Sequence, residues 1–430
     1  MTLPSSRADR TLLVLLFLAF LLRMAAVPIN LRMAERRGIR FYDEYGGIAQ
    51  NIVEGHGFSY AWQGPLRPTS IHAPLYPSLL AGMFTVFGID RAAPAVIILN
   101  ILISIGLLWH VHGFLRRNFG AGPALLGLAI LVFLPTQIYY SSSGLPTVLY
   151  ATGLSLVMMQ AWRTWHKPDA ANGALWGLLI GGCALSYSFV LVLVPFLVLW
   201  LILSVPAPRR TLAFSAAAIA VAVAILMCVP WTIRNYHVHG RWILIRDQGG
   251  INLWWGNQQY ATGGAMDKRG ICLGTIPPEA SKVMEAFDNE VDADRYMGRL
   301  AREEMRANPG RTMALWARKI GMFWWFTSGP RTAGLGIEQV MPVLMLSKGL
   351  LLLFSGWGMI LLASRHRALA VLILIVCLSI TFVHMVFHAG NIRYFFPLEP
   401  ILAGPAGLAA AALLSRKGTW LRRITGEVAA

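Results

Sequence analysis

Residues 12–29, LLVLLFLAFLLRMAAVPI, and residues 40–47, RFYDEYGG, together decide how this chain folds. The first stretch is long and apolar enough to cross a membrane as a helix, because a hydrocarbon core of about 30 Å requires roughly 20 residues. No small-residue cleavage site follows it, so the sequence predicts a retained first helix and not a signal peptide. The second stretch places two adjacent acids, Asp43 and Glu44, in a chain that is otherwise poor in carboxylates.

Apolar runs of similar length recur along the rest of the chain. Of its 430 residues 56% are hydrophobic and only 13% are charged, and the mean hydropathy is +0.57. This composition predicts an all-α polytopic membrane protein with a single transmembrane domain over residues 1–430. The candidate spans, about ten, are residues 11–29, 74–88, 93–114, 122–140, 144–162, 174–205, 211–230, 340–363, 368–388 and 396–414.

Two hydrophilic segments interrupt the spans, at residues 30–73 and 231–339. Basic residues near both termini favour the cytoplasm, so both long loops are expected on the outer side of the membrane. One arrangement stays open: 174–205 is either one span or a helical pair, and 74–88 either crosses or does not. In the second loop, residues 279–308 read as a surface helix that stops at Pro309, followed by an aromatic interfacial element at 316–326.

The placement of the positive charge argues against nucleic-acid binding, and the spacing of the cysteines argues against a metal site. The formal net charge of +17 resides mostly in short loops and termini, where basic residues act as topology signals and contact lipid headgroups. Neither the four dispersed cysteines nor the histidine pairs predict a metal site or a disulfide framework. These residues are Cys183, Cys228, Cys272 and Cys377, the pair His237 and His239, and the pair His384 and His388.

The distribution of acids shows where carboxylate chemistry is possible. Of the twenty Asp and Glu residues, five lie between Glu35 and Asp90 and ten between Asp247 and Glu304, while only Asp169 falls between these groups. The predicted spans contain essentially no acids, which counts against a cation-coupled transporter or pump. Carboxylate chemistry is therefore expected from the two loops.

Several residues in the loops have two readings from pattern alone. Asp43 precedes a helical pattern at residues 45–55, so it either caps that helix or works as a functional carboxylate. His72 stands at the mouth of the second candidate span, as an interfacial residue or a ligand. Arg234 closely follows a span end, where it either snorkels to headgroups or holds a lipid phosphate. Arg393 lies between the last two spans, on the side of both loops.

Four stretches in order carry a resemblance to bacterial membrane glycosyltransferases of the GT-C superfamily. Within this superfamily, the chain resembles the branch that contains the protein O-mannosyltransferases and the lipid A aminoarabinose transferases. These stretches are FYDEYGGIAQNIVEGHGF (41–58), HAPLYPSLLAGMFTVFG (72–88), VPWTIRNYHVHG with GGINLWWGN (229–240 and 249–257), and NIRYFFPLEPILAGPAGLAA (391–410).

The resemblance implies a GT-C-type bundle of about ten helices, with two extracytoplasmic loops that carry interfacial helices. It implies transfer of a hexose or pentose from a polyprenyl-phosphate carrier to a lipid, glycan or protein acceptor, at the outer face of a bacterial inner membrane. Asp43 maps to the catalytic carboxylate, with Glu44 as its neighbour. The expected substrate-binding residues are His72, Arg234, Arg393 and Tyr394.

The expected chemistry suits these residues. Direct displacement of a lipid phosphate by an acceptor hydroxyl or amine inverts the anomeric centre, and it needs a base and cations that stabilise the leaving phosphate. No cofactor is expected, because the donor arrives already activated on a lipid. A transporter or flippase for a lipid-linked saccharide is the alternative with the same hydropathy.

Three departures from the family pattern stand out. Relatives commonly carry another acid near the connection of spans four and five, where this chain has Pro146 and Thr147. His72 replaces a lysine of some relatives, so its contact with phosphate would depend on protonation. The chain also lacks the sizeable soluble C-terminal domain of some relatives, and acceptor recognition is therefore expected in the second loop.

Overall fold

The computed structural model contains α-helices and a single short β-hairpin in the part of the chain that it describes. The described residues are 7–61, 65–264, 286–287, 289–325, 337–387, 389 and 392–415. The hairpin pairs β1 (Ser59–Tyr60) with β2 (Arg67–Pro68) in antiparallel register, within the first loop.

The helices follow one another with short connections. In chain order they are α1 (Arg7–Arg37), α2 (Glu44–Val53), α3 (Leu75–Phe87), α4 (Ala92–Phe119), α5 (Ala121–Phe133), α6 (Pro135–Ser141), α7 (Thr147–His166), α8 (Ala170–Ser186), α9 (Val194–Ser204), α10 (Arg210–His239), α11 (Gly249–Asn257), α13 (Glu290–Ala307), α14 (Pro309–Trp324), α15 (Ile337–Arg365), α16 (Arg367–Val386) and α17 (Glu399–Ser415). Short 3-10 turns join several of them, including η1 (Gly38–Tyr42), η3 (Ser188–Val192) and η6 (Ile392–Tyr394).

The prediction of an all-α polytopic membrane protein is confirmed. Among the described residues, six helical segments are long and apolar enough to cross a membrane, or seven if α5 and α6 count as one span bent by 63°. Three shorter apolar helices, α3, α8 and α9, accompany them. The bend between α5 and α6 lies at Leu134, where the following Pro135 disfavours helical backbone.

The candidate span at 174–205 is not one helix, so its reading as a helical pair is correct. The α8 residues Gly173 and Gly181 approach Ala216 and Met227 of α10 so closely that a Cβ on either glycine would lie within 2.8 Å of its neighbour. The residue numbers rise together, so α8 and α10 run parallel. The chain must therefore turn back between them, through η3 and α9.

Other helix ends also differ from the sequence prediction. The helix at 74–88 has only 13 residues in α3, about 20 Å at 1.5 Å per residue, which is too short to cross a hydrocarbon core. Helices α1 and α10 continue past Pro28 and Pro230, so the second loop begins at Gly240 and not at 231. Because neighbouring helices and polar side chains can re-satisfy freed backbone groups, proline is tolerated inside such helices.

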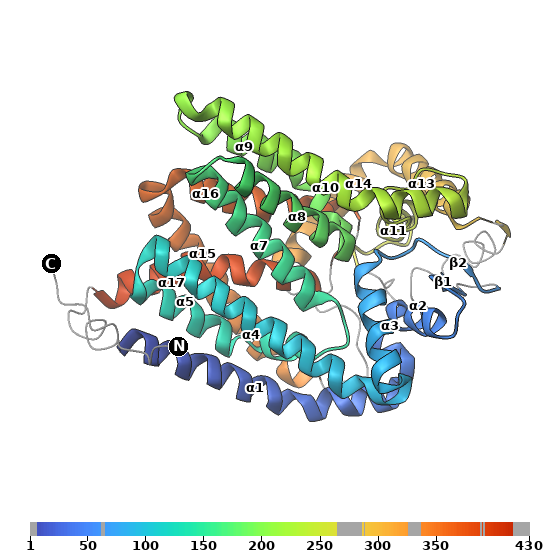
Figure 1. The fold of residues 1–430 in the computed structure, drawn as a ribbon, viewed down its shortest axis with the longest axis horizontal. Helices are drawn as coiled ribbons and strands as arrows, with labels where there is room; N and C mark the ends of the chain where they lie inside the picture. Colours follow the sequence, from blue (N-terminus) through green and yellow to red (C-terminus); the bar gives the residue numbers. More distant parts are fainter. Residues whose placement is uncertain are drawn as a thin grey trace.

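The elements of the two long loops gather at one end of the bundle. Figure 1 shows α2, β1 and β2 of the first loop beside α11 and α13 of the second loop, at the right of the view, whereas α1 begins and α17 ends at the left. The loops thus share one end, as alternation of spans predicts. Their placement outside the membrane remains a prediction.

The second loop contains helices where the sequence predicts them. Helix α13 begins after Asn289, whose side chain accepts a hydrogen bond from the Val291 amide, and it ends before Pro309. The predicted helix was longer, but residues 279–285 lie outside the described ranges. Helix α14 contains most of the predicted aromatic element, and its Lys319 is fully buried and donates to the carbonyl oxygen of Phe387 at 2.6 Å. This contact attaches the loop to the end of α16.

An arginine is buried in the middle of the first helix. Arg23 has no exposed surface, and its Nε donates to the hydroxyls of Ser104 on α4 (3.0 Å) and Ser141 on α6 (3.1 Å). Its Nη1 contacts the carbonyl oxygen of Ala19. These contacts tie α1 to the helices whose ends form the site described next.

Candidate active site

Asp43 lies in the sharp turn between η1 and α2. With φ 51° and ψ −147°, it is the one non-glycine residue with positive φ among those described. Such backbone is unfavourable for a residue with a Cβ and is held only where the surroundings impose it. The Asp43 side chain makes no cap hydrogen bond to α2. Asp43 thus occupies the N-cap position of α2 without capping the helix through its side chain.

The Asp43 carboxylate instead pairs with an arginine 350 positions away in sequence. Nη1 of Arg393, in η6, donates to Oδ2 of Asp43 at 3.0 Å. The guanidinium also lies 5.5 Å from the ring of Tyr394, and that ring stacks on His384 at 4.5 Å. The pair of Asp43 and Arg393, which we call the pocket rim, thus joins the first loop to the start of the last helix.

Glu44 makes a second pair beside the first. Its Oε2 lies 2.8 Å from Nε2 of His72, whose ring stacks on Tyr45 at a centroid distance of 4.0 Å. Burial lowers the pKa of His72 despite this contact, so the imidazole is neutral near pH 7 and donates its Nε2–H. Burial by itself would raise the pKa of Glu44, but the hydrogen bond from His72 and the charges of Arg246 and Arg393 give a net lowering.

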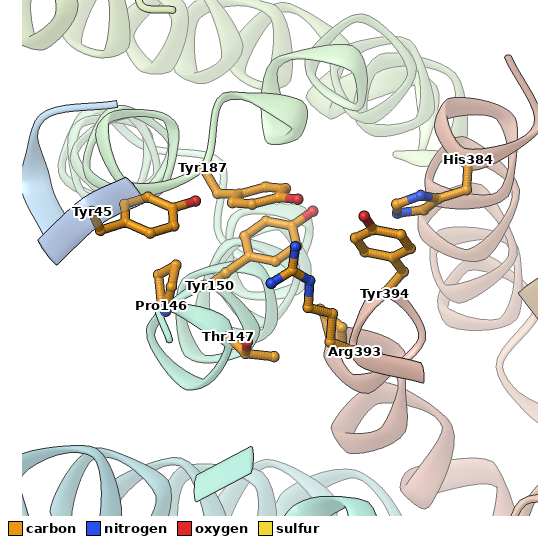
Figure 2. A pocket seen from close by; sticks show the side chains of 9 residues that line it. Tyr45, Pro146, Thr147, Tyr150, Tyr187, His384, Arg393 and Tyr394 are labelled. Carbon is orange, nitrogen blue, oxygen red and sulfur yellow. The ribbon is translucent and has the colours of Figure 1, made fainter. Parts of the chain in front are cut away.

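A pocket opens next to the rim. It measures about 440 Å³, counting the space at its open mouth. Figure 2 shows tyrosine rings, Arg393 and His384 around it. The lining residues are Tyr45, Pro146, Thr147, Tyr150, Tyr187, His384, Arg393, Tyr394 and Pro397.

The connection between α6 and α7 forms one wall of this pocket and packs against the first loop. The Tyr76 hydroxyl donates to the carbonyl oxygen of Gly144 at 2.6 Å, and the Asn100 amide donates to that of Ser143 at 2.7 Å. A Cβ on Gly144 would lie 2.6 Å from the Phe41 ring, so only glycine allows this approach. The wall carries Pro146 and Thr147 where relatives commonly place an acid.

Arg246 is a cation that the sequence analysis did not single out. It lies over the Phe189 ring at 5.6 Å and donates to the side-chain oxygen of Gln248. Its charge acts on Tyr45 and Tyr187 of the pocket as well as on Glu44. In sequence it is one more basic residue in a basic loop, so no pattern marks it.

Arg234 lies apart from the pocket lining. Its guanidinium donates to the carbonyl oxygens of Thr69 (2.6 Å) and Phe58 (2.8 Å), and it lies 4.8 Å from the Trp231 ring. Nearby polar side chains extend these contacts. We call this group the loop junction: Ser70, Arg234, Asn235, His239 and Glu290. Here Arg234 fastens the first loop to α10.

The acids of the second loop also hold backbone. Glu290 accepts hydrogen bonds from the hydroxyl of Thr69 (2.7 Å) and the amide of Ser70 (2.5 Å). Asp294 accepts from the amides of Gly250 and Ile251 in the first turn of α11. Burial, together with the charges of Asp294 and Glu290, raises the pKa of Asp247 to about 9. These acids serve structure, and Asp247 is protonated at neutral pH.

The described residues contain no group of three or more His, Cys, Asp or Glu side chains that could hold a metal ion. His384, half of one histidine pair, stacks between Phe323 and Tyr394, while His388 lies outside the described ranges. Cys183, Cys228 and Cys377 are buried and free. Cys272 also falls outside the described part.

Comparison with known proteins agrees with this architecture. Residues 71–233 match the model of the dolichyl-phosphate-mannose-protein mannosyltransferase family. The oligosaccharyltransferase AglB from Archaeoglobus fulgidus, in complex with an inhibitory peptide and a dolichol-phosphate, has the same fold, with a TM-score of 0.60 at 14% identity over 97% of this chain and 52% of that chain. The family model thus matches one stretch of the sequence, and the fold of the chain is similar to that of the archaeal enzyme.

Further comparisons set the limits of this relationship. The apo form of the archaeal enzyme gives a TM-score of 0.58 at 12% identity over 97% of this chain and 52% of that one, so this chain spans about half the length of that enzyme. ArnT from Cupriavidus metallidurans bound to undecaprenyl phosphate aligns at a TM-score of only 0.44, with 15% identity over 90% of this chain and 77% of that one. No protein of curated function matches the sequence.

The structure brings together most of the site residues that the sequence predicts. Asp43, Arg393 and Tyr394 meet at the pocket, and Glu44 and His72 adjoin it through Tyr45. Of the predicted residues, Arg393 and Tyr394 line the pocket, whereas Arg234 lies apart from it at the loop junction. The residues that sequence reasoning missed are Tyr45, Tyr150, Tyr187 and Arg246.

Proposed function

We propose that this protein is an inverting GT-C glycosyltransferase that moves a sugar from a polyprenyl-phosphate carrier to a hydroxyl or amine acceptor. The observation that carries the proposal is the ion pair between Asp43 and Arg393 at the edge of a tyrosine-lined pocket. A carboxylate beside a guanidinium provides, in one place, a base for the acceptor and a cation for the leaving phosphate.

In the proposed reaction, Asp43 takes the proton from the acceptor group as the acceptor atom bonds to the anomeric carbon. The bond from that carbon to the phosphate oxygen breaks on the opposite face, and the phosphate leaves with the electron pair, still attached to its lipid. Inversion at the anomeric carbon follows from this single displacement. General-base help of this kind contributes about 10²–10⁴-fold to a rate.

Arg393 holds the leaving phosphate in this proposal, with Arg246 as the second cation. The donor phosphate competes with Asp43 for the Arg393 guanidinium, because both are anions and the fork of an arginine binds either. Donor binding then frees the carboxylate to act as a base. A neutral His72 contributes little charge to the phosphate, and instead it holds Glu44 in place beside the rim.

We place the reaction at the outer face of a bacterial inner membrane, with both termini in the cytoplasm. The acceptor is a lipid, a glycan or a protein, and the two loops at the pocket end of the bundle are where it would dock. No cofactor takes part in the proposed step, since the lipid phosphate is itself the leaving group.

The test is a transfer assay with purified protein in lipid nanodiscs. The donor is undecaprenyl-phosphate mannose with a radiolabelled sugar, and the acceptor is a solubilised membrane extract. We expect label in the acceptor fraction and an equal amount of free undecaprenyl phosphate. Asp43→Asn serves as the inactive control, and Asp90→Asn, an acid of the short 3-10 turn before α4, as the active one. Carrier translocation in liposomes with no transfer to any acceptor would contradict the proposal and favour a flippase.

A further inference from the structure

The pocket beside the rim has an unusual lining for a site next to an ion pair. Four phenol side chains face it from separate parts of the chain: Tyr45 in α2, Tyr150 in α7, Tyr187 at the end of α8, and Tyr394 in η6. Aromatic faces pack on apolar C–H groups, and phenolic hydroxyls both donate and accept hydrogen bonds. A sugar ring offers both kinds of surface.

The Tyr150 hydroxyl has no partner among the described residues. The side chain is only 6% exposed, and the hydroxyl oxygen is buried without a hydrogen bond. Leaving a buried polar group unpaired is unfavourable, and native proteins rarely do so without a reason. In Figure 2 this hydroxyl points into the pocket, and the Tyr150 ring lies 4.4 Å from the ring of Tyr187. A ligand in the pocket would supply the missing partner.

The charges around the pocket discriminate between classes of sugar. Arg393 lines it, and the charge of Arg246 reaches its tyrosines. The two acids close to it are already engaged, Asp43 with Arg393 and Glu44 with His72. An ammonium group on the ring would meet the guanidinium of Arg393 and find no free carboxylate among the described lining residues, whereas uncharged hydroxyls can pair with the phenols.

We propose that this pocket holds the sugar ring of an uncharged monosaccharide donor, and that the Tyr150 hydroxyl binds one of its hydroxyl groups and thereby sets specificity. The inference rests on the proposed function and adds the class of sugar and the residue that selects it. Arg393 then lies between ring and phosphate, as expected if the anomeric carbon sits at the rim.

The experiment measures donor kcat/KM for wild type and Tyr150→Phe, with undecaprenyl-phosphate mannose and with undecaprenyl-phosphate 4-amino-4-deoxyarabinose. We expect wild type to prefer the uncharged donor at least tenfold. Tyr150→Phe should lower kcat/KM for the mannose donor by about tenfold, which is the upper range for the loss of one hydrogen bond. The KM for the acceptor should stay unchanged. Monodeoxy mannose donors should include one that wild type uses about tenfold less well and Tyr150→Phe does not penalise further.

The matched control is Tyr42→Phe. The Tyr42 hydroxyl is likewise buried and without a partner among described residues, but its ring packs against Phe41 and Phe84 and does not line the pocket. This variant should keep wild-type kinetics. If Tyr150→Phe does not fold, Tyr187→Phe, whose hydroxyl faces the same space, takes its place with the same expected loss of donor kcat/KM.

Two results would overturn the inference while the proposed function stands. One is transfer by wild type with no difference in donor kcat/KM between wild type and the pocket tyrosine variants. The other is a preference for the amino sugar. Absence of transfer by wild type with every donor would instead overturn the proposed function itself.

Discussion

The pocket rim and the loop junction lie at the same end of the bundle, yet they use the same residue types in opposite ways. At the rim, a carboxylate on a strained turn pairs with a guanidinium beside an open pocket. At the junction, Arg234 donates hydrogen bonds to backbone carbonyl oxygens, and Glu290 accepts one from a backbone amide. The difference teaches that chemistry is available where charged groups are paired with an exchangeable partner, and absent where they hold the main chain.

The sharpest test of this comparison exchanges one carboxylate in each region for its amide. Asp43→Asn should lower kcat by about 10²–10⁴-fold with the fold intact, because it removes the proposed base. Glu290→Gln should leave kcat of the folded protein within about twofold and lower stability by about 1–3 kcal/mol, because a charged acceptor of two hydrogen bonds is lost. Transfer rates and thermal melts in nanodiscs measure both, and full activity of Asp43→Asn would refute the catalytic assignment.

The two arginines allow a second exchange. Arg393→Lys should raise donor KM by about tenfold, because lysine keeps the charge but not the bidentate geometry that suits a phosphate. Arg234→Lys should lower the apparent melting temperature and leave donor KM near wild type, since its guanidinium spans two carbonyl oxygens. Donor titrations decide the matter. A rise in donor KM for Arg234→Lys alone would return Arg234 to the phosphate site that its sequence position predicts.

The buried carboxyl of Asp247 makes the stability of the protein depend on pH. This carboxyl keeps its proton up to about pH 9 in the folded protein, whereas an unfolded chain loses it near pH 4. Between these values the folded state binds more protons, so this group makes stability fall as pH rises. Asp247→Asn removes that effect and should raise the apparent melting temperature, little at pH 5 and by a few degrees at pH 8. A gain that does not grow with pH would contradict the protonated state.

The smallest effect is expected on the exposed face of the second loop. Asp292 lies 3.6 Å from Arg241, and both side chains are well exposed to solvent. Exposed pairs of this kind contribute about 0–1 kcal/mol. Asp292→Asn should therefore change neither transfer rate nor melting temperature measurably, in contrast to Glu290 two positions earlier. A clear loss of stability would mean that α13 relies on its surface charges as well as on its buried contacts.

The acids at and beside the rim could be predicted from the sequence, because carboxylates are rare in this chain and these two are adjacent. Asp43 and Glu44 stand out in a chain with few carboxylates, and the helix that follows them has a regular apolar pattern. Arg393 came from the family resemblance. Its pairing with Asp43, 350 positions away, depends on how the last helices pack, which no local pattern encodes.

The pocket itself could not be predicted, because its tyrosines lie inside or beside apolar runs and look like core residues. Tyr150 is one of many aromatic residues that lie in apolar runs. Its place in the lining of a cavity follows only from the fold. For a similar reason, the sequence does not decide whether the chain reverses direction near Tyr187. The stretch that follows, SFVLV in η3, is apolar and contains no glycine or proline to mark a break.

The buried Arg23 has a consequence for how the protein is made. A lone arginine at the centre of a membrane helix is unfavourable by about 2.5–3.5 kcal/mol even on the scale measured for cellular insertion. The hydroxyls that accept from Nε of Arg23 belong to Ser104 and Ser141, which the ribosome adds 81 and 118 residues later. The first helix to be synthesised therefore waits for α4 and α6 before its buried arginine can make these contacts.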